Sequence, residues 1–175
     1  MRTLITGGTG FIGAEIARML VNDDEEVHVA HRSGNLGRLD DISDKVHLHQ
    51  FDLSDPGGAS SLLNEVAPER LFHFGAILTA PGEDDPQALL KANALGFIET
   101  IEAARLAGTQ QMIFASSIGT YGRDTGGGVI SDLTLQRPSS VYGVTKVFGE
   151  NLGSYYRQKY GLDFRALRYP SIVGP

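Results

Sequence analysis

The 175-residue chain contains neither cysteine nor tryptophan, and it has no long apolar run. The absence of cysteine excludes disulfide bonds, thiolate nucleophiles and thiolate metal ligands. No apolar stretch reaches the roughly 18 residues that a membrane-spanning helix needs, and no secretory signal opens the chain. We therefore expect a cytoplasmic protein that does not bind membranes.

Positive charge is also scarce, with 15 lysines and arginines against 21 aspartates and glutamates and a net charge of −6. No basic stripe is present, so nucleic acid and anionic membrane surfaces are not expected as partners. The length suits one domain with a substantial core. We accordingly expect a single domain over residues 1–175 that acts on a small molecule.

Short apolar runs alternate with segments of helical periodicity along the chain. This alternation predicts an α/β fold of the Rossmann type, a doubly wound parallel sheet with helices on both faces. The predicted strands cover residues 2–6, 26–31, 46–51, 71–75, 111–115 and 164–167. The predicted helices cover residues 11–21, 86–107 and 141–160.

A glycine-rich turn joins the first predicted strand to the first predicted helix. Gly7, Gly10 and Gly13 have the spacing of a dinucleotide-binding turn, in which the backbone must approach a pyrophosphate closely. The N–H groups and dipole of the following helix attract phosphate, so Phe11 and Ile12 are expected to contact the cofactor too. The turn predicts an NAD or NADP site.

The end of the second predicted strand bears on the choice between these two cofactors. Its residues are His31, Arg32 and Ser33, and no acidic residue stands there to accept a hydrogen bond from a ribose 2′-hydroxyl. Arg32 and Ser33 could hold a 2′-phosphate instead, so NADP is favoured over NAD. Asp52 and Leu53 follow the next strand, where a carboxylate could hold the adenine amino group.

Tyr142 and Lys146 are four residues apart in a predicted helix, so they share one face about 5–6 Å apart at Cβ. The ammonium group is expected to lower the pKa of the phenol, which would make Tyr142 an acid/base group. Ser117 follows a predicted strand and could orient a substrate oxygen toward Tyr142. Asn93 could hold a water molecule that connects Lys146 with solvent.

The combination of these motifs resembles the extended short-chain dehydrogenase/reductases of the NAD-dependent epimerase/dehydratase group. The resemblance implies that Tyr142 is the acid/base, Lys146 its activator, Ser117 the substrate orienter and Asn93 the relay residue. It also implies an enzyme that transfers hydride between NAD(P) and a carbinol carbon. The substrate would be a small-molecule alcohol or a sugar nucleotide, and the assembly a homodimer.

A finer resemblance, to the L-threonine dehydrogenase branch, is visible in Gly75-Ala76-Ile77-Leu78-Thr79 and in the segment from Leu167 to Pro170. It implies that Gly75, Ala76 and Tyr169 contact the cofactor. It also implies that Thr79, Ser117 and Tyr142 contact the substrate. Two departures, the missing acid after the second strand and Ser171 in place of glycine, leave the substrate open.

Members of this group continue for well over a hundred residues beyond the segment that matches the end of this chain. The resemblance therefore implies that most of the C-terminal substrate domain is absent, and that the 175-residue chain alone need not be active. A sugar-nucleotide epimerase or dehydratase is an alternative function. A dinucleotide-binding regulator without turnover is another, although such proteins often lose the tyrosine or the lysine.

The histidines are not expected to bind metal. His47 and His49 share one face of a predicted strand, and His28 and His73 lie in others, but no sequence spacing supplies a third ligand. We expect structural or surface roles for these side chains.

Overall fold

Six parallel strands form the sheet in the computed structural model of the protein, which describes residues 1–32, 34–122 and 128–174. The strands are β1 (Arg2–Thr6), β2 (Glu26–His31), β3 (Val46–Gln50), β4 (Arg70–His73), β5 (Gln111–Ser117) and β6 (Asp163–Tyr169). Their order across the sheet is β3-β2-β1-β4-β5-β6, and every neighbouring pair is parallel. This is the Rossmann strand order, so the predicted fold is confirmed.

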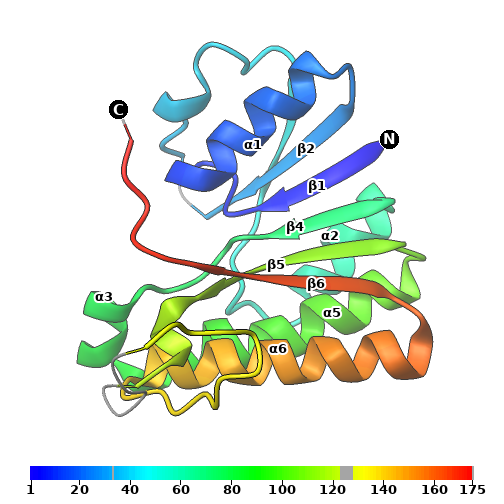
Figure 1. Cartoon of the computed structure of the whole chain (residues 1–175). Coiled ribbons are helices and arrows are strands. Elements are labelled where there is room, and N and C mark those ends of the chain that lie inside the picture. The colour runs from blue at the N-terminus through cyan, green and yellow to red at the C-terminus, as the bar shows by residue number, and fades with distance from the viewer. Residues whose placement is uncertain (33, 123–127, 175) are drawn as a thin grey trace.

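Helices cover both faces of the sheet, as expected (Figure 1). α1 (Phe11–Asn22) packs on one face, whereas α2 (Gly58–Val66), α5 (Gly96–Leu106) and α6 (Val141–Tyr160) pack on the other. The shorter elements are α3 (Thr79–Asp84), α4 (Pro86–Leu90) and the 3-10 turns at Gly37–Leu39 and Ile118–Thr120. Within the part of the chain that the structure describes, no helix combines the length and apolarity that a membrane span requires.

Alternation along β1 divides the core into two layers. Leu4 and Ile5 are both fully buried, but they point to opposite faces of the strand. Leu4 packs with residues of α2, α5 and α6, and Ile5 packs with residues of α1 and β2. Thr3 and Thr6 are buried as well, so β1 is covered on both faces, as strands of a parallel sheet usually are.

Several elements differ from the sequence prediction. α2 was not predicted. Its nine residues directly follow Gly57, which has a left-handed φ of 78°. The helix predicted over residues 86–107 is interrupted by a π-helical turn at Lys91–Leu95, which separates α4 from α5. β5 runs two residues further than predicted, so Ser117 is its last residue.

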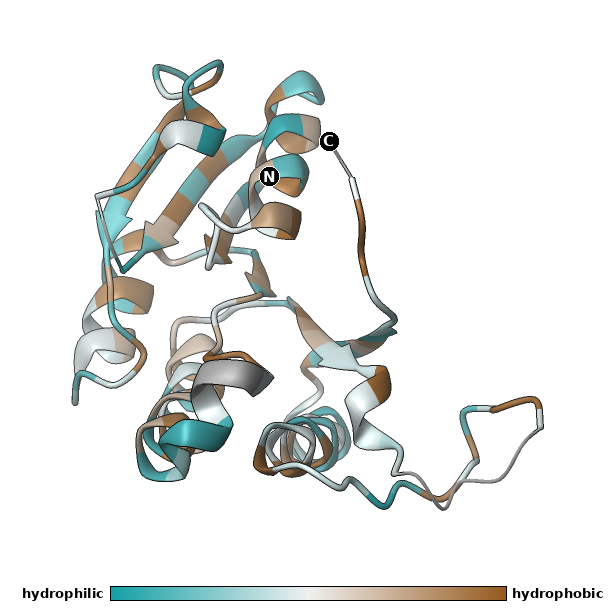
Figure 2. Ribbon diagram, turned by 90° about the vertical axis from the view of Figure 1, so that its left-hand side faces the viewer, coloured by the Kyte–Doolittle hydropathy of each residue, from teal (hydrophilic) through white to brown (hydrophobic). Residues whose placement is uncertain are grey.

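The segment after β6 crosses the end of the sheet toward the start of α1 (Figures 1 and 2). A Cβ atom on Gly174 would lie 2.6 Å from the ring of Phe11, so the two segments are in contact. Pro170, Ser171 and Ile172 consequently line the space between α1 and β6. This crossing closes one side of the cavity described next.

Candidate functional site

A cavity of about 820 Å³ opens beyond the carboxyl ends of the strands, where open parallel sheets bind their ligands. Most of the site residues predicted from sequence line it: Gly7, Gly10, Phe11, Ile12, Gly13, Arg32, Asp52, Leu53, Gly75, Ala76, Thr79, Ser117, Tyr142, Lys146 and Tyr169. His31 and Asn93 are not among the lining residues, and Ser33 falls outside the described residues. The fold thus brings the glycine turn and the tyrosine–lysine pair to one cavity.

The glycine turn depends on close backbone packing. Gly7 has a φ of +69°, and a Cβ atom there would lie 2.7 Å from the backbone nitrogen of Gly75. A Cβ atom on Gly13 would lie 2.5 Å from the carbonyl oxygen of Gly7. At Gly10 the nearest atom to a Cβ would be that same carbonyl oxygen, at 3.1 Å. Gly7 and Gly13 therefore hold the turn together, whereas Gly10 faces the cavity.

The start of α1 fits a phosphate group. No side chain caps this helix at Gly10, and the first intrahelical bond from this end runs from Ala14 N to Gly10 O, at 3.0 Å. The N–H groups of Phe11, Ile12 and Gly13 precede that bond at the positive end of the helix dipole. A pyrophosphate above Gly10 would satisfy these donors, so the residues present suit a dinucleotide.

Asp52 and Arg32 line the same cavity. Asp52 Oδ1 accepts hydrogen bonds from the Ser54 backbone nitrogen at 2.8 Å and from the Ser54 hydroxyl at 2.7 Å. The bond from the Ser54 backbone is the main cause that lowers the pKa of Asp52, and the charge of Arg32 acts in the same direction. Asp52 is therefore an anion, and its Oδ2 atom takes no part in the bonds to Ser54.

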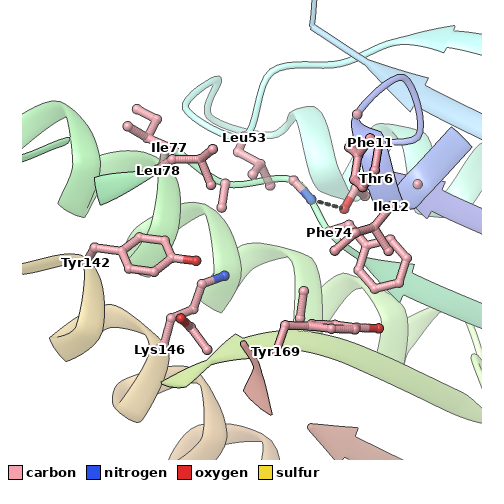
Figure 3. A pocket seen from close by; sticks show the side chains of 18 of the residues that line it. Thr6, Phe11, Ile12, Leu53, Phe74, Ile77, Leu78, Tyr142, Lys146 and Tyr169 are labelled. Atoms are coloured by element: carbon pink, nitrogen blue, oxygen red, sulfur yellow. Dashed lines mark hydrogen bonds between the residues drawn. The ribbon is translucent and has the colours of Figure 1, made fainter. Parts of the chain in front are cut away.

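Tyr142 and Lys146 project from α6 into the cavity, facing Ile77 and Leu78 across it (Figure 3). Lys146 is buried, with 4% of its surface exposed. Its ammonium nitrogen lies 5.3 Å from the centre of the Tyr142 ring and 4.8 Å from the centre of the Phe114 ring. Burial lowers the pKa of Lys146 to about 8, because the charged form loses its hydration.

The lowered pKa that the sequence predicted for Tyr142 is not found in this structure. Burial of the phenol raises its pKa, and a hydrogen bond with Ser117 acts in the opposite direction without outweighing burial. The prediction counted the neighbouring cation but not the desolvation of the phenol itself. Further positive charge at the phenol would be needed to favour its ionised form.

The start of α6 is fixed by two contacts that position Tyr142. The Ser140 hydroxyl caps the helix by accepting from the Gly143 backbone nitrogen at 3.0 Å. Glu83 of α3 accepts from the Tyr142 backbone nitrogen at 3.2 Å. The sequence analysis missed Glu83, since no local motif connects it with a helix 58 residues further along the chain.

Ser117 ends β5 directly beside Tyr169, its partner in the register with β6. Its hydroxyl oxygen accepts from the Gly119 backbone nitrogen at 3.0 Å, which turns the chain into the following 3-10 turn. The same hydroxyl faces Tyr142. Ser117 is therefore placed between the strand end and the phenol, as its predicted role requires.

The Asn93 side chain forms hydrogen bonds with the backbone of the loop after β4. The side chain is buried in the π-helical turn, where its Oδ1 accepts from Ile77 N and its Nδ2 donates to Ile77 O, both at 2.8 Å. π-Helical turns are frequent at functional sites, and this one aims the amide at a loop that lines the cavity. A water relay through Asn93 could still use its second amide N–H or the second lone pair of Oδ1, and it stays a prediction.

The histidines fall into two environments. His73 is buried, contacts the Thr6 hydroxyl at 3.1 Å and has its pKa lowered to about 3 by burial, so it is a neutral core residue. That the histidines bind no metal stays a prediction, but a carboxylate and a second histidine do lie near His47 in space, although no sequence spacing indicated them. Register between β2 and β3 brings Glu26 and His28 to it, with one ligand atom of each residue within 4.8 Å of the others.

Comparisons with known proteins agree with this geometry. The model of the NAD dependent epimerase/dehydratase family matches residues 3–175. The chain is 35% identical to the mitochondrial L-threonine 3-dehydrogenase of Sus scrofa over 98% of its own length and 46% of that relative. It is 34% identical to the UDP-glucose 4-epimerase of Mycolicibacterium smegmatis over 100% of its length and 57% of that relative.

Among solved structures, the UDP-glucose 4-epimerase of Thermus thermophilus in complex with NAD is similar, with a TM-score of 0.87 and 32% sequence identity. The alignment covers 97% of this chain and 55% of that one. The chain thus spans about half the length of these relatives.

Proposed function

Because this chain belongs to the NAD dependent epimerase/dehydratase family, we propose that it binds a nicotinamide dinucleotide and supports hydride transfer at a carbinol carbon of a small molecule. One observation carries this proposal. The glycine turn, Ser117, Tyr142 and Lys146 line the same cavity, although they are far apart in the sequence. A nucleotide seated on the turn would have its reactive end beside the tyrosine.

Tyr142 takes the proton of the substrate hydroxyl in this proposal, and Ser117 orients the substrate oxygen. When bound, the oxidised nicotinamide accepts the hydride and brings a positive charge near the phenol. Lys146 contributes a second positive charge and holds the nicotinamide ribose. Burial raises the pKa of Tyr142, so this proposal needs both positive charges to favour the ionised phenol.

NADP is the proposed cofactor, with NAD as the alternative. Arg32 lines the cavity beyond the end of β2, where a guanidinium suits a 2′-phosphate. His31 ends β2 without lining the cavity, so the preference rests on Arg32. The NAD bound in the Thermus thermophilus relative favours the alternative.

An amino alcohol of the L-threonine type is the first proposed substrate, and a sugar nucleotide is the second. Thr79 lines the cavity and offers a hydroxyl for a polar substrate. One relative is a threonine dehydrogenase and another is a UDP-glucose epimerase, so both classes have support. Net oxidation and epimerisation would use the same tyrosine. The substrate panel described below distinguishes the two reactions.

A dinucleotide-binding regulator without turnover is the alternative of another class. It would need the glycine turn but not the tyrosine–lysine pair. The burial of Lys146 favours the enzyme, because a buried ammonium is costly and has no use in mere cofactor binding at the phosphates.

The test is reduction of NADP⁺ and NAD⁺ by a panel of alcohols, followed by absorbance in the complete protein that carries this sequence. L-Threonine is paired with L-2-aminobutyrate, which lacks the carbinol, and UDP-glucose is followed separately for epimerisation. Turnover with one carbinol and none with its deoxy partner is expected. Cofactor binding without turnover of any substrate would favour the regulator.

The homodimer and the cytoplasmic compartment remain predictions as well. Exposed apolar side chains at the two ends of α5 support a second copy, since Leu95, the residue before this helix, is 62% exposed and Leu106, its last residue, is 67% exposed. Sedimentation at two protein concentrations would test the dimer.

A further inference from the structure

Three histidines and two glutamates gather at the edge of the sheet, away from the nucleotide cavity. The register of β2 with β3 places His28 beside His47, and His49 follows two residues later on the same face. Glu26 is the first residue of β2, and Glu65 comes from α2. None of these five side chains is among the residues that line the large cavity.

A chain of contacts fixes the orientation of His28. His49 Nδ1 faces Glu65 Oε1 at 3.6 Å, and His49 Nε2 lies 2.9 Å from His28 Nδ1. Two arrangements of the ring protons fit these contacts. With the proton of His49 on Nε2, His49 donates to His28 Nδ1, and His28 Nε2 donates to Glu26. With the proton of His49 on Nδ1, toward Glu65, His28 Nδ1 donates to His49 Nε2, and the lone pair of His28 resides on its own Nε2.

In the second arrangement that lone pair points at another acceptor. His28 Nε2 lies 3.0 Å from Glu26 Oε1, so a metal ion or an added proton between the two atoms would hold them together. Arg2 Nε also contacts Glu26 Oε1, at 3.1 Å, but it belongs to a half-exposed pair at the rim. His47 supplies a third ligand atom, and its ring stacks on that of His28 with 4.6 Å between the centroids.

We propose that Glu26, His28 and His47 form a site for a divalent transition-metal ion such as Zn²⁺, which fastens the edge strand β3 to β2. Two imidazoles and one carboxylate are ligands that Zn²⁺ accepts at about 2.0–2.2 Å, in a tetrahedron whose ligands are about 3.3 Å apart. Glu26 and His47 are exposed, so small rotations can close the set and water can take the fourth position. His49 and Glu65 act behind His28, as the outer partners of metal-bound histidines do.

The experiment is a calorimetric titration of ZnCl₂ into the untagged, chelator-treated protein, without nucleotide. His47→Gln removes an exposed ligand and leaves the core intact. His31→Gln is the matched control, because it removes a histidine from the opposite face of β2. Thermal unfolding with and without Zn²⁺ is recorded for all three proteins.

We expect one equivalent of Zn²⁺ to bind, at least tenfold weaker binding in His47→Gln, and unchanged binding in His31→Gln. Saturating Zn²⁺ should raise the melting temperature of the wild type by about 5 °C or more, since the ion binds only the folded ligand set. The proposal is overturned if no saturable binding occurs, which would mean that a proton bridges His28 and Glu26. Equal affinity in wild type and His47→Gln would overturn it too, as adventitious binding elsewhere.

Discussion

The ammonium nitrogen of Lys146 lies 5.3 Å from the centre of the Tyr142 ring, one turn along the same helix. This arrangement places a cation beside the phenol, but it takes that cation out of water. The pKa of Lys146 falls to about 8 as a result, while burial raises the pKa of Tyr142. Burial of the charged Lys146 is therefore unfavourable for folding, and the rest of the fold must offset it.

Lys146→Met should make the protein more stable at pH 7. The pKa of Lys146 is about 8 in the folded chain, against about 10.4 in an unfolded one, so the protonated form opposes folding by at most about 3 kcal/mol. The unfolded chain holds the extra proton between these values, so wild-type stability gains a contribution as pH rises from 8 to 10. The variant lacks that gain.

Urea unfolding at pH 7 and pH 9.5 measures this difference. Lys159→Met is the control, because Lys159 lies on the same helix but is exposed. A Lys146→Met protein that is less stable than the wild type at pH 7 would show that the ammonium is well solvated or paired.

Asn93→Asp should destabilise the fold by about 1–3 kcal/mol, because a carboxylate oxygen would replace the amide donor opposite Ile77 O. Cofactor affinity should fall as well, since Ile77 lines the cavity. Asn151→Asp makes the same chemical change at an exposed position of α6 and should change little. Equal unfolding midpoints for the two variants would show that the amide does not hold the loop.

Arg32→Ala should reduce the preference for NADP over NAD by about tenfold or more, because a charge-assisted contact with phosphate contributes about 1.5–3 kcal/mol. Calorimetric titration with each nucleotide gives the ratio directly. If the wild type binds NAD more tightly, or if the ratio is the same in Arg32→Ala, NADP is not the preferred cofactor.

Gly10→Val should abolish dinucleotide binding with little effect on folding. A Cβ atom at Gly10 meets only the Gly7 carbonyl oxygen, at 3.1 Å, and the rest of the side chain would occupy the phosphate position. Gly128→Val is the control, because a Cβ atom there meets nothing within 4 Å and Gly128 does not line the cavity. If Gly10→Val binds the dinucleotide as tightly as the wild type, the phosphates do not bind at the glycine turn.

The parts of the fold that local sequence specifies were predicted well. The turn from Gly7 to Gly13 and the pair Tyr142 and Lys146 carry their spacing in the sequence, so both were placed on the correct elements. The parallel sheet with helices on both faces followed from the alternation of strands and helices along the chain. The cavity residues after β3 and β4 then followed from the fold.

Features that depend on contacts between distant segments were not predictable in this way. Glu83 reaches Tyr142 across 59 positions, and Asn93 meets Ile77 only because a π-helical turn rotates it. The direction of the Tyr142 pKa depends on burial, which no spacing rule provides. Likewise, Glu26 joins His47 only through the register of β2 and β3.

The central claim is that Tyr142 transfers the proton, and Tyr142→Phe in the complete protein tests it most directly. The change removes one hydroxyl and little volume, so folding and cofactor affinity should stay near those of the wild type. Tyr155→Phe, on an exposed part of the same helix, is the control. General acid–base catalysis contributes about 10²–10⁴-fold, so turnover with the physiological alcohol should fall by at least about a hundredfold in Tyr142→Phe and stay unchanged in Tyr155→Phe. Near-normal turnover in Tyr142→Phe, with cofactor still bound, would contradict the proposed mechanism.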